Sequence, residues 1–310
     1  MRSTTRLLTT VLALLAFHPA GAVSTRGHAV NDLKLPDTTA EANSYAIDLD
    51  GDGTPQNQFG NALYALAFAF ELDVAGNTSA AVASGQVVHL VELRSTDATF
   101  TNDTAAEATW HVGVAAPAPP LFDGSDTFRY DPDFLNGTFV APLVSHAFVS
   151  AIPATSSEPA YVFVRIRIES QTFLLQLQGG RLKFTTTPTG LVLGQGNGSI
   201  SKEDIDNVFV PTLADAFNEV IQADPQSDRA MSLLQTFDNN PMNGTISVAE
   251  VVADSLIETI LRPDVDIRDE NGNYAPNPTN PEKDALSFGF GFTAVTSVTI
   301  LPRIFEDGFE

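Results

Sequence analysis

The chain has 310 residues, with 38 acidic side chains against 16 basic ones and a formal net charge of −22 at pH 7. This acidity argues against binding to nucleic acid or to anionic membrane surfaces, whose phosphates would be repelled, and it is compatible with multivalent cations as partners. The chain has no cysteine, so no disulfide can cross-link the fold, but it is long enough to bury a self-sufficient core.

The first residues have the three parts of a secretory signal. Arg2 and Arg6 give a positive start, residues 7–17 are apolar except for two threonines, and Ala20-Gly21-Ala22 provides the small residues that a signal peptidase accepts. The apolar run is about half of the roughly 20 residues that a membrane span needs. We therefore predict a signal peptide over residues 1–22, an exported protein (extracellular or periplasmic), and no membrane span after cleavage.

An acidic motif follows a stretch, residues 23–45, that has no clear period and is expected to be a polar lead-in. The motif is D-x-D-x-D-G and supplies Asp48, Asp50 and Asp52 on alternate residues. It resembles the acidic loops of EF-hands, dockerins and thrombospondin type 3 repeats, and the resemblance implies a calcium site. The twelfth position of the loop is Phe59, so Gln56, Asn57 or a remote carboxylate would have to complete the shell; the alternative is a solvated acidic turn.

Short β-branched and aromatic runs, separated by turn residues, dominate the next part of the chain. In residues 162–168 apolar side chains alternate with Phe163, Arg165 and Arg167, as a half-buried antiparallel strand requires. The regular spacing of the runs predicts an antiparallel β-sandwich. The expected strands cover residues 63–72, 86–93, 108–115, 138–144, 160–169 and 172–177.

Helical spacing replaces the strand pattern over residues 201–222, 226–237 and 247–261. Ser247 and Glu250 have the spacing of a capping box at the start of the last helix. Strand character returns over residues 285–301, where three alternate phenylalanines are separated by glycines. We therefore predict a mainly β fold in which a helical segment interrupts the sandwich and the last strand completes it.

An internal repeat adds a second candidate site within the helical segment. Residues 197–204 and 243–250 share the pattern N-G-[ST]-I-S-x-x-[DE], which resembles the second half of an EF-hand loop. The resemblance implies that Ile200 and Ile246 pair the two loops. For the second copy it implies the ligands Asp238, Asn240, Asn243, the carbonyl of Thr245, and Glu250.

The repeat also departs from the EF-hand pattern. Asp238 lies one residue too early relative to Gly244, and Pro241 and Met242 occupy positions where a further acid is expected. The first copy has Leu193 and Gln195 at its early ligand positions, so it is expected to support its twin without binding an ion. The alternative is a pair of unrelated helix starts that use Asn-Gly turns.

The predicted organisation has six parts. They are a signal peptide (1–22), a polar lead-in (23–45), a β-sandwich with an N-terminal acidic loop (46–190), an EF-hand-like helical segment (191–263), an acidic loop with a returning strand (264–303) and a C-terminal tail (304–310). The acidic side chains of residues 264–284 are either an ion site or a hydrophilic loop. The tail ends in Asp-Gly-Phe-Glu, which is similar to the ends of uncharacterised secreted bacterial proteins that carry D-x-D-G-D-G loops.

No catalytic motif stands out in the sequence. There is no cysteine, no G-x-S-x-G and no H-E-x-x-H, and His89, His111 and Trp110 are expected to pack in strands. The leading hypothesis is a secreted, non-enzymatic calcium-binding protein whose acidic loops are stabilised by calcium. The alternatives are a calcium-dependent carbohydrate-binding or adhesive sandwich with a glycan or cell-surface ligand, and a hydrolase with unidentified carboxylates.

Overall fold

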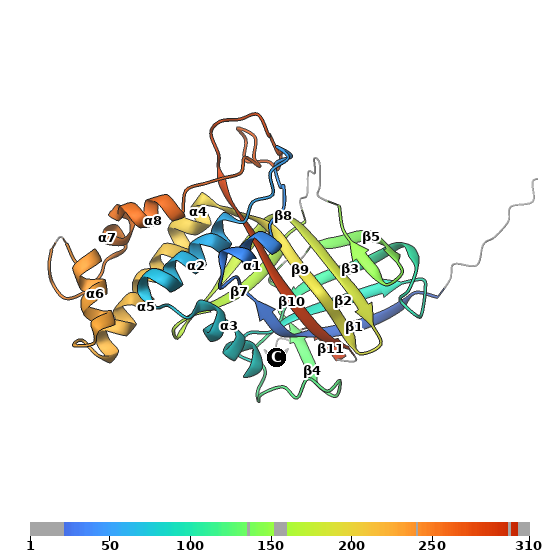
Figure 1. The fold of residues 1–310 in the computed structure, drawn as a ribbon. Coiled ribbons are helices and arrows are strands. Elements are labelled where there is room, and N and C mark those ends of the chain that lie inside the picture. Colours follow the sequence, from blue (N-terminus) through green and yellow to red (C-terminus); the bar gives the residue numbers. More distant parts are fainter. Residues whose placement is uncertain (1–21, 135–136, 152–159, 240, 297–298, 303–310) are drawn as a thin grey trace, which may run out of the picture.

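The structure is a computed structural model that describes residues 22–134, 137–151, 160–239, 241–296 and 299–302 (Figure 1). The predicted signal peptide, apart from its last residue, lies outside the described residues, as do the C-terminal tail and Asn240.

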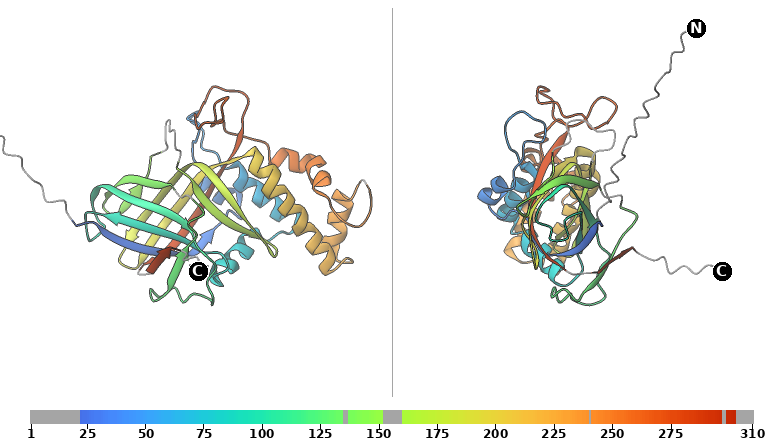
Figure 2. Two further views of the ribbon diagram at one scale, coloured as in Figure 1. Left: turned by 180° about the vertical axis from the view of Figure 1, so that it is seen from behind. Right: turned by 90° about the vertical axis from the view of Figure 1, so that its right-hand side faces the viewer.

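A single large antiparallel sheet is the main element of the fold. Nine strands follow the order β6-β5-β3-β2-β1-β10-β9-β8-β7, and β6 also pairs with β8, so the sheet closes on itself (Figure 2). The strands are β1 Ser24–Lys34, β2 His89–Ser95, β3 Asp103–Val112, β4 Thr127–Tyr130, β5 Thr138–Val144, β6 Ala147–Val149, β7 Val162–Ile168, β8 Gln171–Thr187, β9 Gly190–Ser201, β10 Ala285–Thr296 and β11 Thr299–Pro302. Strands β4 and β11 form a separate parallel pair. The mainly β fold with a helical insertion is confirmed. Its β part is one sheet that closes on itself, where a sandwich would have two packed sheets.

The helices gather mainly at one end of the closed sheet (Figure 1). They are α1 Thr39–Ser44, α2 Gln58–Phe70, α3 Val74–Ala83, α4 Lys202–Asp204, the π-helical turn η1 Ile205–Phe209, α5 Val210–Ala223, α6 Asp228–Phe237, α7 Val248–Ala253 and α8 Ser255–Ile260. The expected helix over residues 247–261 is two short helices, because Asp254 ends α7 and its side chain caps α8.

Aromatic side chains make the sheet and the helical insertion one core. The ring of Phe59 on α2 meets Phe209 at 4.9 Å and Phe288 on β10 at 5.0 Å, both edge to face. Such pairs add to the free energy gained by burial alone. Strand β10 lies between β1 and β9, so the prediction that a strand returns after the helical segment to complete the sheet is confirmed for residues 285–296. The end of the expected strand belongs to β11, which pairs with β4.

Residues 23–45 are not a polar lead-in. Strand β1 pairs with β2 on one side and with β10 on the other, and it buries Val30 and Leu33. Its register with β10 shifts between Val30 and Asp32, which interrupts the alternation of side chains. A strand with such an irregularity has no simple period of two, so the sequence pattern concealed it.

The strand expected over residues 63–72 is wrong, because residues 63–70 belong to helix α2. Asn57 caps the helix by accepting a hydrogen bond from the N–H of Gly60. The buried side chains Phe59, Leu63, Leu66 and Phe70 follow one helical face. Helix α3, which follows directly, also lies within the part of the chain where the sequence predicts strands.

Side chains form hydrogen bonds with the backbone of strand β7 on the edge that has no neighbouring strand in the described part of the chain. The indole Nε1 of Trp110 donates to the carbonyl of Phe163 at 2.8 Å, and Nε2 of His89 accepts from the N–H of Arg165 at 2.9 Å. Trp110 and His89 are both fully buried. Both residues therefore have structural roles, as expected for packed side chains in strands.

Candidate metal sites

The acidic motif forms a tight loop outside the closed sheet. A backbone bridge between Ile47 and Gln56 joins its two ends. Gly51 and Gly53 have φ angles of 83° and 87°, and these left-handed conformations favour glycine. The glycines therefore turn the chain so that the intervening aspartates can face one another.

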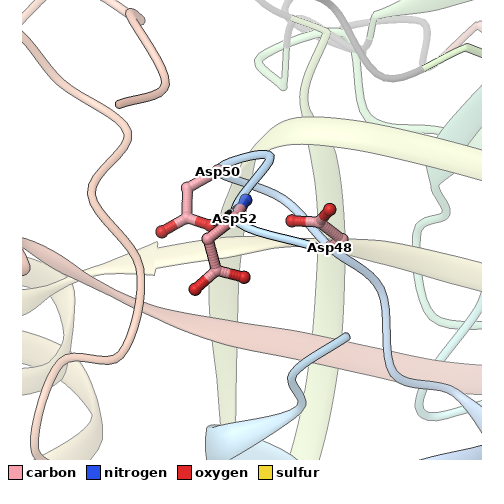
Figure 3. Close-up of side chains that lie close together, drawn as sticks. All are labelled: Asp48, Asp50 and Asp52. Atoms are coloured by element: carbon pink, nitrogen blue, oxygen red, sulfur yellow. Dashed lines mark hydrogen bonds between the residues drawn. The ribbon is translucent and has the colours of Figure 1, made fainter. Parts of the chain in front are cut away.

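The carboxylates of Asp48, Asp50 and Asp52 converge in this loop (Figure 3). One oxygen from each lies within 4.8 Å of the others. Among the described residues they are the one group of three or more acidic, histidine or cysteine side chains that could hold a metal ion. Carboxylate oxygens this close repel one another, and a hard divalent cation relieves that repulsion.

Backbone N–H groups hold the loop in shape. Asp48 accepts from Gly51 at 2.8 Å and from Gly53 at 3.0 Å, and Asp52 accepts from Thr54 at 2.7 Å. These bonds use lone pairs of each carboxylate but leave others, since an ionised carboxylate has about four acceptor positions. The carboxylates are thus oriented by the protein itself.

Lys283 is a fixed cation beside this cluster. Its Nζ lies 2.7 Å from Oδ2 of Asp50, whose side chain has no exposed surface. The hydrogen bond to Asp50 raises the pKa of Lys283, and the charges of Asp52 and Asp266 act in the same direction. An ion at the cluster would therefore compete with the ammonium group for Asp50.

The acidic stretch over residues 264–284 lies beside the first loop (Figure 1). Ile47 and Leu49 pack against Val265, Ile267 and Tyr274 in a small core of their own. This core joins two acidic segments that are more than 200 residues apart in the sequence. Sequence reasoning treated them as separate clusters, and it gave no role to Lys283.

Only part of the second stretch faces the cluster. Asp264 accepts two hydrogen bonds from Ser287, and burial is the main cause that raises its pKa, with a contribution from Asp50. Burial also raises the pKa of Asp284, and Asp266 adds to the effect. Asp269 instead closes an exposed turn by accepting from Asn271.

The two neighbouring amides considered as further ligands have different surroundings. Asn57 is buried, and its side chain bonds to Gly60, Gly289 and Ala42, so it is not available to an ion. The Nε2 of Gln56 lies 3.4 Å from Asp52, and its Oε1 is buried without a hydrogen-bond partner. Gln56 is therefore the amide that could supply a ligand oxygen.

The second candidate loop has the predicted helix–loop–helix context, between α6 and α7. Asp238 accepts from the N–H groups of Asn243 and Gly244 at 2.9 and 2.8 Å. Oδ1 of Asn243 accepts from the N–H of Thr245 at 2.9 Å. The structure therefore brings Asp238 and Asn243 together at the turn.

Glu250 closes the second loop from the start of α7. The capping box with Ser247 is present, and the other oxygen of Glu250 accepts from the N–H of Asn239 at 3.1 Å. Its side chain is buried and occupied in tying the two ends of the loop together. With two carboxylates, this loop is a weaker cation ligand than the Asp48–Asp52 loop.

The first copy of the repeat is not a loop, because residues 197–201 lie within strand β9. Ile200 pairs with Leu286 of β10, so the predicted strand pairing of Ile200 with Ile246 is not formed. Ile246 is held instead by Asn218, whose amide bonds to both its N–H and its carbonyl. Strand β9 needs small residues because it packs closely against aromatic rings: a Cβ on Gly196 would meet the ring of Phe290.

Comparisons of the chain with protein-family models, curated proteins and solved structures find no match. Across the described residues, no helix is long and apolar enough to cross a membrane.

Proposed function

We propose that the chain is a secreted, non-enzymatic calcium-binding protein in which calcium stabilises an acidic loop. The observation that carries the proposal is the convergence of Asp48, Asp50 and Asp52 within 4.8 Å on a loop that the backbone already orients. Calcium accepts six to eight oxygen ligands in flexible geometry, so it suits a site made of carboxylates, an amide and water. Gln56 is the neighbouring amide for that shell.

The principal test is titration calorimetry with calcium after chelator treatment. We expect saturable binding to the wild type and loss of one site in the Asp50→Ala/Asp52→Ala variant. Calcium at about 100 times its dissociation constant should stabilise the fold by about 2.7 kcal/mol, a rise of roughly 5–10 °C in the melting temperature. Absence of heat at millimolar calcium contradicts the proposal.

The second loop has its own test. Glu250→Gln keeps the shape of the capping side chain but removes its charge, so it should lower calcium binding only if this loop contributes a site. Asp73→Asn, at the exposed cap of α3, is the matched control for loss of an acidic cap. An unchanged stoichiometry in Glu250→Gln assigns all the binding to the Asp48–Asp52 loop.

Export is a separate part of the proposal. It is supported by the signal-like residues 1–22. Expression of the full chain with its own N-terminus should release a product that begins at Val23, as read by N-terminal sequencing of the medium or periplasm. A product that keeps Met1 and stays in the cytoplasm contradicts this part alone.

A further inference from the structure

A small polar pocket lies on the outer face of strands β8 and β9. Its volume is about 210 Å³, and it is lined by Ser44, Ala46, Ile47, Arg181, Lys183, Gln195 and Asn197. Two basic side chains and no acidic one line it, in a chain with more than twice as many acids as bases. Four other surface pockets each contain at least one carboxylate side chain.

The sheet and the segment after α1 build this pocket together. Arg181 pairs with Asn197, and Lys183 with Gln195, across β8 and β9, so the four side chains share one face. Nδ2 of Asn197 donates to the carbonyl of Tyr45 at 2.6 Å, which holds the wall in place.

Two glycines on β10 allow the segment of residues 44–47, which forms one wall of the pocket, to lie close against the sheet. A Cβ on Gly289 would collide with the carbonyl of Tyr45, and a Cβ on Gly291 with the Tyr45 ring. The main chain of residues 44–47 therefore approaches the strands closely and encloses one side of the two cations. The pocket is a feature of the folded backbone and does not depend on flexible side chains alone.

Arg181 is held in position but its charge is not balanced. Its Nε donates to the carbonyl of Ser150 at 2.9 Å, and burial lowers its pKa from the usual value for arginine. Within the described part of the chain, neither Arg181 nor Lys183 forms an ion pair, and the terminal nitrogens of Arg181 have no hydrogen-bond partner. A partly desolvated guanidinium of this kind gains from an anion that can accept two parallel hydrogen bonds.

We propose that this pocket binds a doubly charged tetrahedral oxyanion, a phosphate or sulfate group, with Arg181 and Lys183 as its two donors. The two positive charges match the charge of the group, and the small volume admits one such group. The fork of Arg181 grips two oxygens while the ammonium of Lys183 reaches a third. The group can come as a free ion or as the ester of a larger ligand, and the shared chemistry is the same. This site is independent of calcium, although Ile47 in its wall directly precedes Asp48.

The test is titration calorimetry of the mature protein in chelator, with sodium phosphate and sodium sulfate as probes. Sodium chloride at matched ionic strength controls for general salt effects, and acetate tests a singly charged anion. We expect saturable binding of phosphate and sulfate and weaker binding of acetate. Glucose 6-phosphate separates the two sources, since tighter binding than inorganic phosphate indicates a group carried by a larger ligand.

Matched variants assign the binding to the pocket. Lys183→Gln alters an exposed side chain and should lower the affinity for phosphate roughly tenfold or more. Arg181→Lys should also lower this affinity, because lysine cannot form two parallel hydrogen bonds to the group. The control Lys34→Gln removes the same charge from a lysine paired with Asp32 and should leave affinity within about twofold. Lack of saturable phosphate and sulfate binding, or equal affinity in Lys183→Gln and wild type, overturns the proposal. Because chelator is present throughout, neither outcome bears on the calcium site.

Discussion

At the scale of single residues, Lys283 and Asp50 define how the acidic loop behaves without an ion. The pair is largely buried, and the ammonium group occupies a position that a bound cation would contest. Breaking a buried ion pair is costly because it leaves one charge without compensation. Loss of the Lys283 ammonium group should also remove a competitor of calcium, so stability and calcium affinity should respond in opposite directions.

Replacing Lys283 by Met tests this opposition. In chelator the variant should lose about 2–3 kcal/mol of unfolding free energy, because Asp50 stays buried without its partner. Calcium affinity should rise, and calcium should restore more stability to the variant than to the wild type. Urea unfolding with and without calcium measures both effects. Lys34→Met breaks an exposed pair and should cost less than 1 kcal/mol in either condition; a calcium affinity lowered by Lys283→Met would place the ion elsewhere.

Two buried histidines predict a loss of stability in mild acid. Burial lowers the pKa of His28 to about 4 and that of His89 to about 3, with charges of Arg26 and Arg165 acting in the same direction. Between these values and the ordinary pKa near 6.5, the unfolded chain binds more protons, so the stability present above pH 6.5 falls as the pH falls. At pH 5 each histidine should cost about 2 kcal/mol relative to pH 8.

The measurement is urea unfolding at pH 5 and pH 8, followed by the fluorescence of Trp110, which lies 5.2 Å from the His89 ring. His28→Gln and His89→Gln should each reduce the loss between the two pH values by about 2 kcal/mol. Asp264 and Asp284 have raised pKa values in the folded protein, so they increase the free energy of unfolding as the pH falls, opposite to the histidines. The comparison of variant with wild type removes their contribution, and identical pH dependence in all three proteins would contradict the assignment.

At the scale of elements, the predictions held where one periodicity dominated the segment. Strand β5 and the alternation in β7 were readable from the sequence because each buries one face. Helix α2 differs from the strand prediction because its leucines and phenylalanines resemble a buried strand run, whereas its alanines favour a helix. Strand β9 was misread because its Asn-Gly step, which suggests a turn, lies in a strand packed against aromatic rings.

Asn57 shows how a cap can join an element to the sheet. Its amide bonds to Gly60 in α2 and to both backbone groups of Gly289 in β10. Asn57→Ala should therefore destabilise the fold by about 2–4 kcal/mol, well above an isolated cap, because buried backbone groups lose their partners. The exposed cap Asp73→Ala should cost about 1 kcal/mol in the same thermal unfolding experiment. Equal costs would show that the contacts to Gly289 contribute nothing.

At the scale of the whole molecule, the sequence could predict the helical insertion but not the closure of the sheet. Closure depends on the pairing of β6 with β8, which places Phe148 opposite Phe184, and no local pattern encodes that register. The meeting of the loops at 46–56 and 264–284 is likewise a product of long-range packing. The motif Asp48–Asp52 was found correctly as a cluster, whereas its neighbour Lys283 could be found only from the fold.

The shared packing of these two loops makes a prediction for hydrogen exchange. Calcium should slow exchange in residues 46–56 and also in residues 264–284, although the converging aspartates belong to the first segment alone. The reason is that Ile47 and Leu49 pack on Val265 and Ile267, so ordering one loop restrains the other. The α6–α7 loop provides an internal comparison. Protection confined to residues 46–56 would show that the two loops move independently.

The central position of β10 also has a consequence for the order in which the molecule can be made. Strands β1 and β9 are synthesised early and midway, yet each pairs with β10, whose residues 285–296 come near the end of the chain. Until those residues emerge, two long strand edges face solvent, and such edges recruit other chains. The nascent protein therefore has to delay closure until synthesis is almost complete. Truncation before residue 285 should produce an aggregating chain and not a smaller folded one.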